Sequence, residues 1–329
     1  MAVLVAGLPD QLRWGLDLDP VPLPPADHVV ILGMGGSGMA GRLAAMVAER
    51  GQAVVQVHPD YGLPRWVIPN RALVVAVSYS GNTAETLTGL TEAVAAGLPV
   101  AVVSTGGEIG ALAVRTGIPS VTVPAGMQPR AALGHLVAAT LSILAAAGVI
   151  PDPSADLSTA ADTAERLLAD GHGPGWALGT ELGEALVDRI PLVIGGSGPA
   201  AMAAGRWATQ FNENAKRAAF AALIPEMNHN ALEALAASVP EPGRLGVVGL
   251  LDPAGVAAND RRIRLTLDRL GPTVARTGEV VAQGEGVLER AVSLIAVGDV
   301  ASVALAERIG VDPVPVDALE GFKRSLQEG

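Results

Sequence analysis

Two apolar segments of strand length each run into the same tetrapeptide, GGSG. HVVILG precedes the turn Gly33–Gly38, and Ile190–Ile194 precedes the turn Gly195–Gly198. Segments with helical character follow both turns, over Met39–Arg50 and from Pro199 to about Ala215. A strand, a glycine-rich turn and a helix form the unit of doubly wound α/β sheets. Its recurrence predicts two Rossmann-like domains built on one plan.

Composition agrees with layered α/β domains. Of 329 residues, 50% are hydrophobic but only 3% are aromatic, so the cores must consist of Ala, Val and Leu. We expect a domain boundary near residue 153, in a proline-containing stretch, which gives domains 1–153 and 154–329. The strands we expect are His28–Gly33, Ala53–Val57, Ala72–Val77, Pro99–Val103 and Ser120–Val123, then Ile190–Ile194, Phe220–Ile224, Gly246–Leu250 and Thr273–Arg276.

Charge and residue usage exclude several classes of protein. A net charge of −11 without a basic cluster disfavours nucleic acid and anionic membranes as partners. The chain has no Cys, and its five His residues follow no metal-binding spacing, so we expect no metal. The apolar run Val137–Ile150 is too short to span a bilayer, and no basic region precedes an apolar core at the N-terminus. We therefore expect a soluble cytoplasmic protein.

The turn Gly33–Gly38, GMGGSG, matches G-x-G-x-x-G, and Asp60 lies 22 residues beyond it, so a dinucleotide site is one interpretation. The next strand favours another, because it runs into SYSGNT and then the helix Ala84–Ala96. Three hydroxyls, of Ser78, Ser80 and Thr83, meet one helix N-terminus and can hold a phosphate without a cation. A simple N-cap with a polar turn is the structural alternative.

The segment NENAKRAAFAALIPEMNHN offers a carboxylate, Glu213, and an imidazole, His229, as candidates for proton transfer. Glu213 falls at the end of a long helix, and His229 in a loop before a helix over Ala231–Ala237. A surface pair of Glu213 with Lys216 is the alternative. Only two of the 22 basic residues are lysines, Lys216 and Lys323, which makes each a candidate for a specific role.

These motifs in this order, GMGGSG, SYSGNT, QPR, ENAK, PEMNHN, GVDP and a final Lys, resemble the bifunctional phosphoglucose/phosphomannose isomerase family, whose members have two sugar-isomerase (SIS) domains. The resemblance implies reversible isomerisation of fructose 6-phosphate with glucose 6-phosphate and mannose 6-phosphate through a cis-enediol, with no cofactor. It also implies a homodimer in which His229 reaches the partner's active site.

The resemblance assigns roles to individual residues. The catalytic residues that it implies are Glu213, His229, Lys323 and Arg130, the last from the QPR segment. The substrate-binding residues that it implies are Gly35, Gly36, Ser37, Ser78, Ser80 and Thr83. Glu226 is a second, lower-ranked candidate for the base.

The chain departs from the family pattern over Glu233–Arg244, where members carry a Trp-containing stretch, so the rim of the site and its substrate preference are open. A non-catalytic sugar-phosphate sensor is the alternative function, because SIS domains also serve as regulatory modules. A sensor would need the phosphate loop but neither Glu213 nor His229.

Overall fold

The computed structural model describes residues 1–49, 51–67, 71–237 and 242–328. Contacts divide the chain into two compact units. The first unit comprises Val3–Asp170 and Gln283–Ser293, and the second comprises Met1–Ala2, Gly171–Ala282 and Leu294–Gly329. The boundary that we expected near residue 153 lies just before α7 (Ser154–Leu168), which packs on α2 (Leu8–Trp14) within the first unit.

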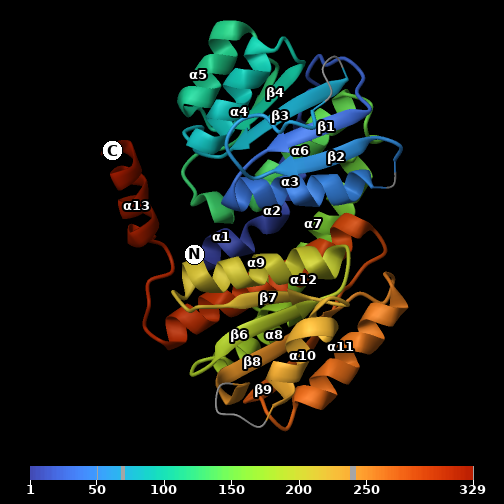
Figure 1. The fold of residues 1–329 in the computed structure, drawn as a ribbon, viewed down its shortest axis with the longest axis vertical. Coiled ribbons are helices and arrows are strands. Elements are labelled where there is room, and N and C mark those ends of the chain that lie inside the picture. The colour runs from blue at the N-terminus through green and yellow to red at the C-terminus, as the bar shows by residue number, and fades with distance from the viewer. Residues whose placement is uncertain (50, 68–70, 238–241, 329) are drawn as a thin grey trace. The chain divides into compact units, whose positions relative to one another are not determined.

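The first unit contains a parallel sheet in the order β2-β1-β3-β4-β5 (Figure 1). Its strands are β1 (His28–Leu32), β2 (Val54–His58), β3 (Ala72–Ser78), β4 (Val100–Ser104) and β5 (Ser120–Thr122). The helices along this part of the chain are α1 (Ala2–Ala6), α2, α3 (Gly35–Ala48), α4 (Ala84–Ala95), α5 (Gly107–Thr116), α6 (Leu133–Ala146) and α7, with short 3-10 turns η1 (Gly15–Asp17), η2 (Pro129–Ala131) and η3 (Ala169–Gly171).

Neighbouring residues of β1 contact helices on opposite faces of this sheet. Gly41 of α3 lies against Ile31, whereas Gly89 of α4 lies against Leu32. Because successive strand residues point to opposite faces, α3 and α4 cover different sides. Strands buried on both faces are mostly apolar, and β1, β3 and β4 follow this pattern, with a polar residue only at one end of each, His28, Ser78 and Ser104.

The second unit repeats the plan with a parallel sheet in the order β7-β6-β8-β9. Its strands are β6 (Ile190–Gly195), β7 (Phe220–Leu223), β8 (Leu245–Leu251) and β9 (Arg276–Val281). The helices along this part of the chain are α8 (Pro174–Ala185), α9 (Pro199–Asn214), α10 (Met227–Ala236), α11 (Ala257–Leu270), α12 (Val287–Arg308) and α13 (Asp317–Glu328), with the 3-10 turn η4 (Pro242–Arg244). The prediction of two doubly wound parallel-sheet domains is confirmed.

Some expected bounds were wrong. The last strand occupies Arg276–Val281 rather than Thr273–Arg276, because Thr273 instead ends the turn after α11, where its N–H donates to the Leu270 carbonyl. The helix that we expected over Ala231–Ala237 begins at Met227, whose buried side chain joins the apolar cluster beneath the sheet. The QPR segment forms the 3-10 turn η2, which begins at Pro129, and α6 starts only at Leu133. Part of the departing segment Glu233–Arg244 lies outside the described residues.

Helices α9 and α12 pack within the second unit through a close contact between Trp207 and Gly298. The indole of Trp207 is fully buried and donates from Nε1 to the Leu294 carbonyl at 2.9 Å. A Cβ built on Gly298 would lie 2.0 Å from that Nε1. The same helices share a buried ion pair, with Arg206 Nε and Nη2 donating to Asp299 at 2.9 and 2.6 Å. The position of α9, and of Glu213 at its end, therefore depends on this seam.

We expect Gly298→Ala to destabilise the protein by about 1–3 kcal/mol, because the added methyl must displace a fully buried indole. Gly271→Ala, after α11, is the control, since its nearest neighbours lie at ordinary contact distance, 3.5 Å or more. Thermal unfolding followed by circular dichroism measures both. Equal melting temperatures for the two variants would contradict the packing described here.

Candidate active site

Two functional motifs follow adjacent strands of the first sheet. The turn GMGGSG follows β1 and opens α3, and the loop SYSGNT follows β3 and opens α4. In the sheet order β2-β1-β3, the chain winds outward in opposite directions from β1 and β3. Crevices at such a switch point, outside the carboxyl ends of parallel strands, are where ligands bind in α/β sheets. The fold therefore brings both motifs to the carboxyl edge of one sheet, beside its switch point.

The loop Ser78–Thr83, called the phosphate loop below, is closed by its own hydroxyls. Ser78 Oγ lies 2.8 Å from Thr83 Oγ1 and accepts from the Gly81 amide at 3.2 Å. Ser78 is fully buried, whereas Ser80 and Asn82 are exposed, and Ser80 Oγ accepts from the Asn82 amide. Thr83 precedes the first turn of α4, whose leading N–H groups have no intrahelical partner. Exposed hydroxyls, free N–H groups and the helix dipole together suit an anion.

Glycines let a second loop support the phosphate loop. A Cβ on Gly81 would lie 1.8 Å from the Gly106 carbonyl, and a Cβ on Gly107 would lie 2.4 Å from the Ser80 carbonyl. All three glycines have positive φ. Asn82 Oδ1 also accepts from the Glu108 amide at 3.0 Å, in the first turn of α5. The turn after β4 thus fixes the shape of the loop after β3.

Tyr79 connects the phosphate loop to two other segments. Its amide donates to Ser37 Oγ of the glycine turn at 3.1 Å. Its hydroxyl donates to the Pro124 carbonyl at 3.0 Å and accepts from the Met127 amide at 2.9 Å. Tyr79 is only 6% exposed. The Ser37 side chain that we predicted as a substrate contact therefore also anchors the phosphate loop.

The QPR segment lies against the glycine turn. A Cβ on Gly36 would lie 2.9 Å from the Pro129 carbonyl and 3.2 Å from Arg130 Cα, so only glycine allows this approach. Arg130 is buried, with 4% exposure. Gln11 of α2 holds the same segment, because its Nε2 donates to the Ala131 carbonyl at 2.8 Å and its Oε1 accepts from the Gly134 amide at 3.0 Å. The glycine turn, the phosphate loop and Arg130 thus form one packed group.

Glu213 lies in the last turn of α9, as predicted, and is half-buried. Its neighbours are tied to the second unit on several sides. Asn212 exchanges hydrogen bonds with both main-chain groups of Ala219, and Asn214 Nδ2 donates to Ser302 Oγ at 2.9 Å. Lys216 Nζ donates to the Glu213 carbonyl itself. The main chain that carries this carboxylate is therefore fixed.

His229 lies in the first turn of α10, where it is exposed and its amide donates to the Glu226 carbonyl at 2.9 Å. Its predicted place in a loop was wrong, since the helix starts two residues earlier. Glu226, the alternative base, is exposed and its Oε1 accepts from Asn230 at 3.1 Å. Lys323 lies on α13 and is exposed. Both His229 and Lys323 are thus accessible from solvent.

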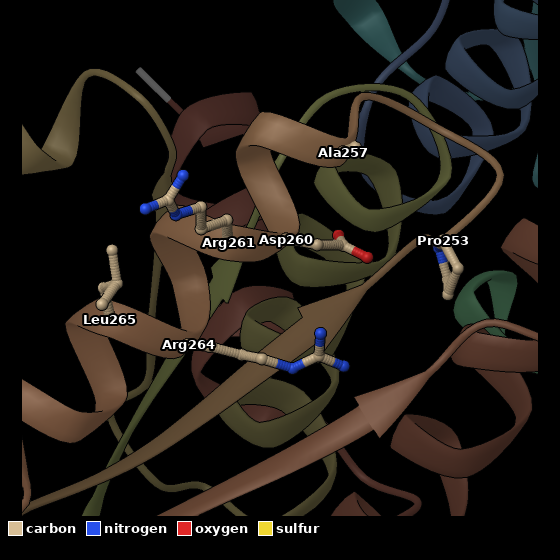
Figure 2. Close-up of a pocket in the computed structure, with 6 residues that line it drawn as sticks. All are labelled: Pro253, Ala257, Asp260, Arg261, Arg264 and Leu265. Carbon is tan, nitrogen blue, oxygen red and sulfur yellow. The ribbon is translucent and has the colours of Figure 1, made fainter.

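The second unit has a counterpart of the phosphate loop with different chemistry. In the second sheet β8 occupies the position that β3 occupies in the first sheet. The loops that follow these strands make the same turn, because the Gly255 amide donates to the Asp252 carbonyl and the Gly81 amide donates to the Ser78 carbonyl. Asp252 therefore stands where the first unit has Ser78, and Asp260 Oδ1 accepts from its amide. Figure 2 shows Asp260 and Arg264 in the hollow beside this loop. Carboxylates thus replace the hydroxyls of the phosphate loop here, while Arg261 and Arg264 also line the hollow.

Sequence reasoning missed three features that organise the site: Tyr79, Gln11 and the glycine pair Gly106–Gly107. Each acts through a contact with a residue distant in the chain. One of only two tyrosines and a glycine pair after a strand were available signals. Within the described ranges, no three His, Asp or Glu side chains are grouped as metal ligands would be, and no helix is long and apolar enough to cross a bilayer.

Two family models match the chain. The SIS domain matches residues 23–148, and the bacterial phospho-glucose isomerase C-terminal SIS domain matches residues 178–326. The first match contains the glycine turn, the phosphate loop and Arg130, and the second contains Glu213, His229 and Lys323. All of these predicted site residues thus lie within the two matched ranges.

Curated relatives match along nearly the whole length. The chain is 32% identical to the bifunctional phosphoglucose/phosphomannose isomerase of Caldicellulosiruptor bescii, covering 98% of each chain. It is 33% identical to the protein of that name from Aquifex aeolicus, covering 99% of this chain and 98% of the relative. Among solved structures, a hypothetical protein from Thermus thermophilus superposes with a TM-score of 0.77 at 17% identity, covering 99% of this chain and 90% of that one.

The hydroxyl of Tyr79 gives a test of the packed group in solution. Burial raises its pKa above the ordinary value of 10.0, and the hydrogen bond from Met127 offsets part of that rise. The folded state thus favours the neutral hydroxyl, so this group's contribution to stability is present below pH 10 and is lost as pH rises through the folded pKa. In a Tyr61→Phe variant, where Tyr79 is the remaining tyrosine, we expect tyrosinate absorbance to appear above pH 10 in the native state and near pH 10 in urea.

The double variant Tyr61→Phe/Tyr79→Phe is the control and should show no tyrosinate signal. Coincident midpoints in native and denatured protein would mean that Tyr79 is not enclosed as described.

Proposed function

The chain belongs to the bifunctional phosphoglucose/phosphomannose isomerase family, and on that premise we propose that it reversibly isomerises fructose 6-phosphate with glucose 6-phosphate and mannose 6-phosphate. The observation that carries the proposal is the phosphate loop, with its exposed Ser80 and the leading N–H groups of α4. Its counterpart in the second unit carries carboxylates instead. One phosphate site and one half-buried carboxylate, Glu213, suit a monophosphorylated sugar undergoing proton transfer.

We assign the phosphate to Ser78, Ser80 and Thr83, with Gly35, Gly36 and Ser37 as the remaining substrate contacts. The hydroxyls of Ser78 and Thr83 are hydrogen-bonded to each other. Their role is therefore to shape the loop, and each can contact the phosphate only through the hydrogen-bonding capacity that this bond leaves. Binding the phosphate, which does not react, supplies the energy that positions the sugar carbons. In this division of labour, the half up to residue 153 holds the substrate, and the half from 154 supplies the base.

Glu213 is the proposed base. With glucose 6-phosphate, its carboxylate removes the proton from C2 while O1 is protonated, which gives a cis-enediol. The same group then returns the proton to C1 as O2 loses its proton, so that one proton has moved from C2 to C1 and one from O2 to O1, and fructose 6-phosphate is formed. A carboxylate suits this step because it must both accept and release the proton. His229 and Lys323 assist ring opening, and Arg130 stabilises the negative charge that develops on the enediolate oxygen.

Both aldoses follow from one intermediate. The enediol has no stereocentre at C2, so the face on which the proton returns decides between glucose and mannose 6-phosphate. Rotation about the C2–C3 bond within the pocket presents either face to Glu213. A single base therefore serves both reactions without metal or cofactor. We further propose that the enzyme acts in the cytoplasm.

We expect purified protein in excess chelator to convert fructose 6-phosphate into both aldose phosphates, detected separately. Glu213→Gln should lower kcat by about 10²–10⁴-fold, the usual contribution of a general base, while leaving KM within a few-fold. Glu226→Gln, which changes an exposed carboxylate of the neighbouring segment, is the matched control and should retain kcat. Binding of the sugar phosphate without turnover would refute the catalytic proposal and favour a sensor.

A homodimer in which each His229 serves the partner's Glu213 is the last part of the proposal. It predicts that Glu213→Gln and His229→Ala proteins, each nearly inactive, regain activity after they are unfolded and refolded together. Random pairing makes half of the dimers mixed, each with one intact site, so about a quarter of wild-type activity should return. No recovery, with mixed dimers present by differential tagging, would place His229 in its own subunit's site.

A further inference from the structure

Lys216, which follows α9, has an unusual backbone conformation. Its φ is +48°, one of three positive values at non-glycine residues in the described ranges, the others being Ala169 and Asp170. Left-handed backbone is costly for a residue with a side chain and persists only when other interactions require it. The residue just after the end of a helix often adopts this conformation, and it is usually glycine. A lysine here therefore requires an explanation from its side chain.

The side chain of Lys216 supplies that explanation. Its Nζ donates to the carbonyl of Glu213 and to the carbonyl of Asp312, both at 2.9 Å. The amide of Arg217 closes the same turn by donating to the Phe211 carbonyl at 3.2 Å. The left-handed backbone turns the side chain back over the end of α9, where a positive charge also interacts favourably with the helix dipole. The ammonium thus joins two segments that are 96 residues apart in the chain.

Each of these two segments leads to a proposed catalytic group. Glu213, whose carbonyl accepts one bond, is the proposed base. Asp312 belongs to the GVDP segment that connects α12 to α13, the helix of Lys323. Asp312 Oδ1 further accepts from the Val314 amide at 2.9 Å, which fixes the connection where it leaves α12. The Lys216 ammonium therefore restrains both the main chain of the proposed base and the segment that leads to α13.

We propose that Lys216 is a positioning residue for the isomerase reaction. Its ammonium holds the end of α9 against the GVDP segment, and this pair of contacts is called the clamp below. This inference rests on the proposed function, because it concerns where Glu213 is held during proton transfer. Lys216 acts through main-chain atoms and takes no proton itself. Its loss should reduce kcat and leave KM little changed, since the phosphate is bound by other residues.

Lys216→Gly separates this role from a structural one. Glycine removes the ammonium and also relieves the left-handed backbone, so the variant should unfold at an unchanged or higher temperature. We nevertheless expect kcat to fall about 10–100-fold, since small misplacements of catalytic groups have effects of that size. Lys216→Met, which keeps the backbone cost and the aliphatic stem, should lose kcat similarly. Asp170→Gly, at the similar φ of +52° in the other unit, is the matched control and should keep full activity.

The absence of Cys allows the ammonium to be restored chemically. In Lys216→Cys the introduced thiol is unique, and Lys216 is exposed, so 2-bromoethylamine can convert it to aminoethylcysteine, a close analogue of lysine. We expect this treatment to recover most of kcat, whereas iodoacetamide, which adds a neutral group, should not. Wild-type kcat in Lys216→Gly and Lys216→Met, or equal recovery with both reagents, would overturn the proposal.

Hydrogen exchange distinguishes failure of the clamp from failure of the proposed function. If the clamp exists, amides of the GVDP segment should exchange faster in Lys216→Met than in wild-type protein, with or without sugar phosphate present. If wild-type protein showed this protection but turned over no hexose phosphate, the function would be wrong and the clamp would stand as a structural feature. Unchanged exchange would overturn the clamp whatever the enzyme does.

Discussion

The close approach of main chains at the carboxyl edge of the first sheet is the constraint on which the candidate site depends. Gly81 meets the Gly106 carbonyl, and Gly36 meets Pro129 and Arg130, at distances that exclude any Cβ. Through these contacts the turn after β4 shapes the phosphate loop, and the QPR segment rests on the glycine turn. Tyr79 and Gln11 then fix the same segments by hydrogen bonds. Pre-organised donors cost little reorganisation when the anion binds, which is the physical advantage of a site assembled from backbone.

The second unit repeats the architecture but not the chemistry of that edge. Its GGSG turn is covered by Asn259, whose Nδ2 donates to Ser197 Oγ, and the loop after β8 has Asp252 where the first unit has Ser78. An ionised carboxylate accepts hydrogen bonds but donates none, so Asp252 cannot bind a phosphate oxygen as a hydroxyl can. The distinctive feature of this unit is instead the seam between α9 and α12, where Trp207, the Arg206–Asp299 pair and the Asn214–Ser302 bond fix one long helix. Glu213 stands at the end of that helix.

Much of this organisation could be predicted from local patterns. Buried parallel strands are mostly apolar, glycine-rich turns follow them, and hydroxyls gather at a helix N-terminus. For this reason β1, β3, the phosphate loop and the end of α9 were predicted close to their observed places. The errors occurred where local signals are weak: α10 begins at Met227 because an apolar contact extends it, and β9 starts three residues later than expected because Thr273 closes a turn. The roles of Gln11, Tyr79 and Lys216 could not be predicted, since each depends on partners far away in sequence.

The acidity of the chain sets a further condition on how it binds an anion. A net charge of −11 opposes the approach of a phosphorylated sugar. Long-range repulsion between exposed charges is screened beyond about 8–10 Å at physiological ionic strength, whereas contacts within the loop act below that distance. In the proposed site, the N–H groups and hydroxyls around Ser80 and the start of α4 would supply such short-range contacts, and salt would ease the approach of the anion. Donors that act at short range and are oriented by the fold would let an acidic protein hold an anion at this site.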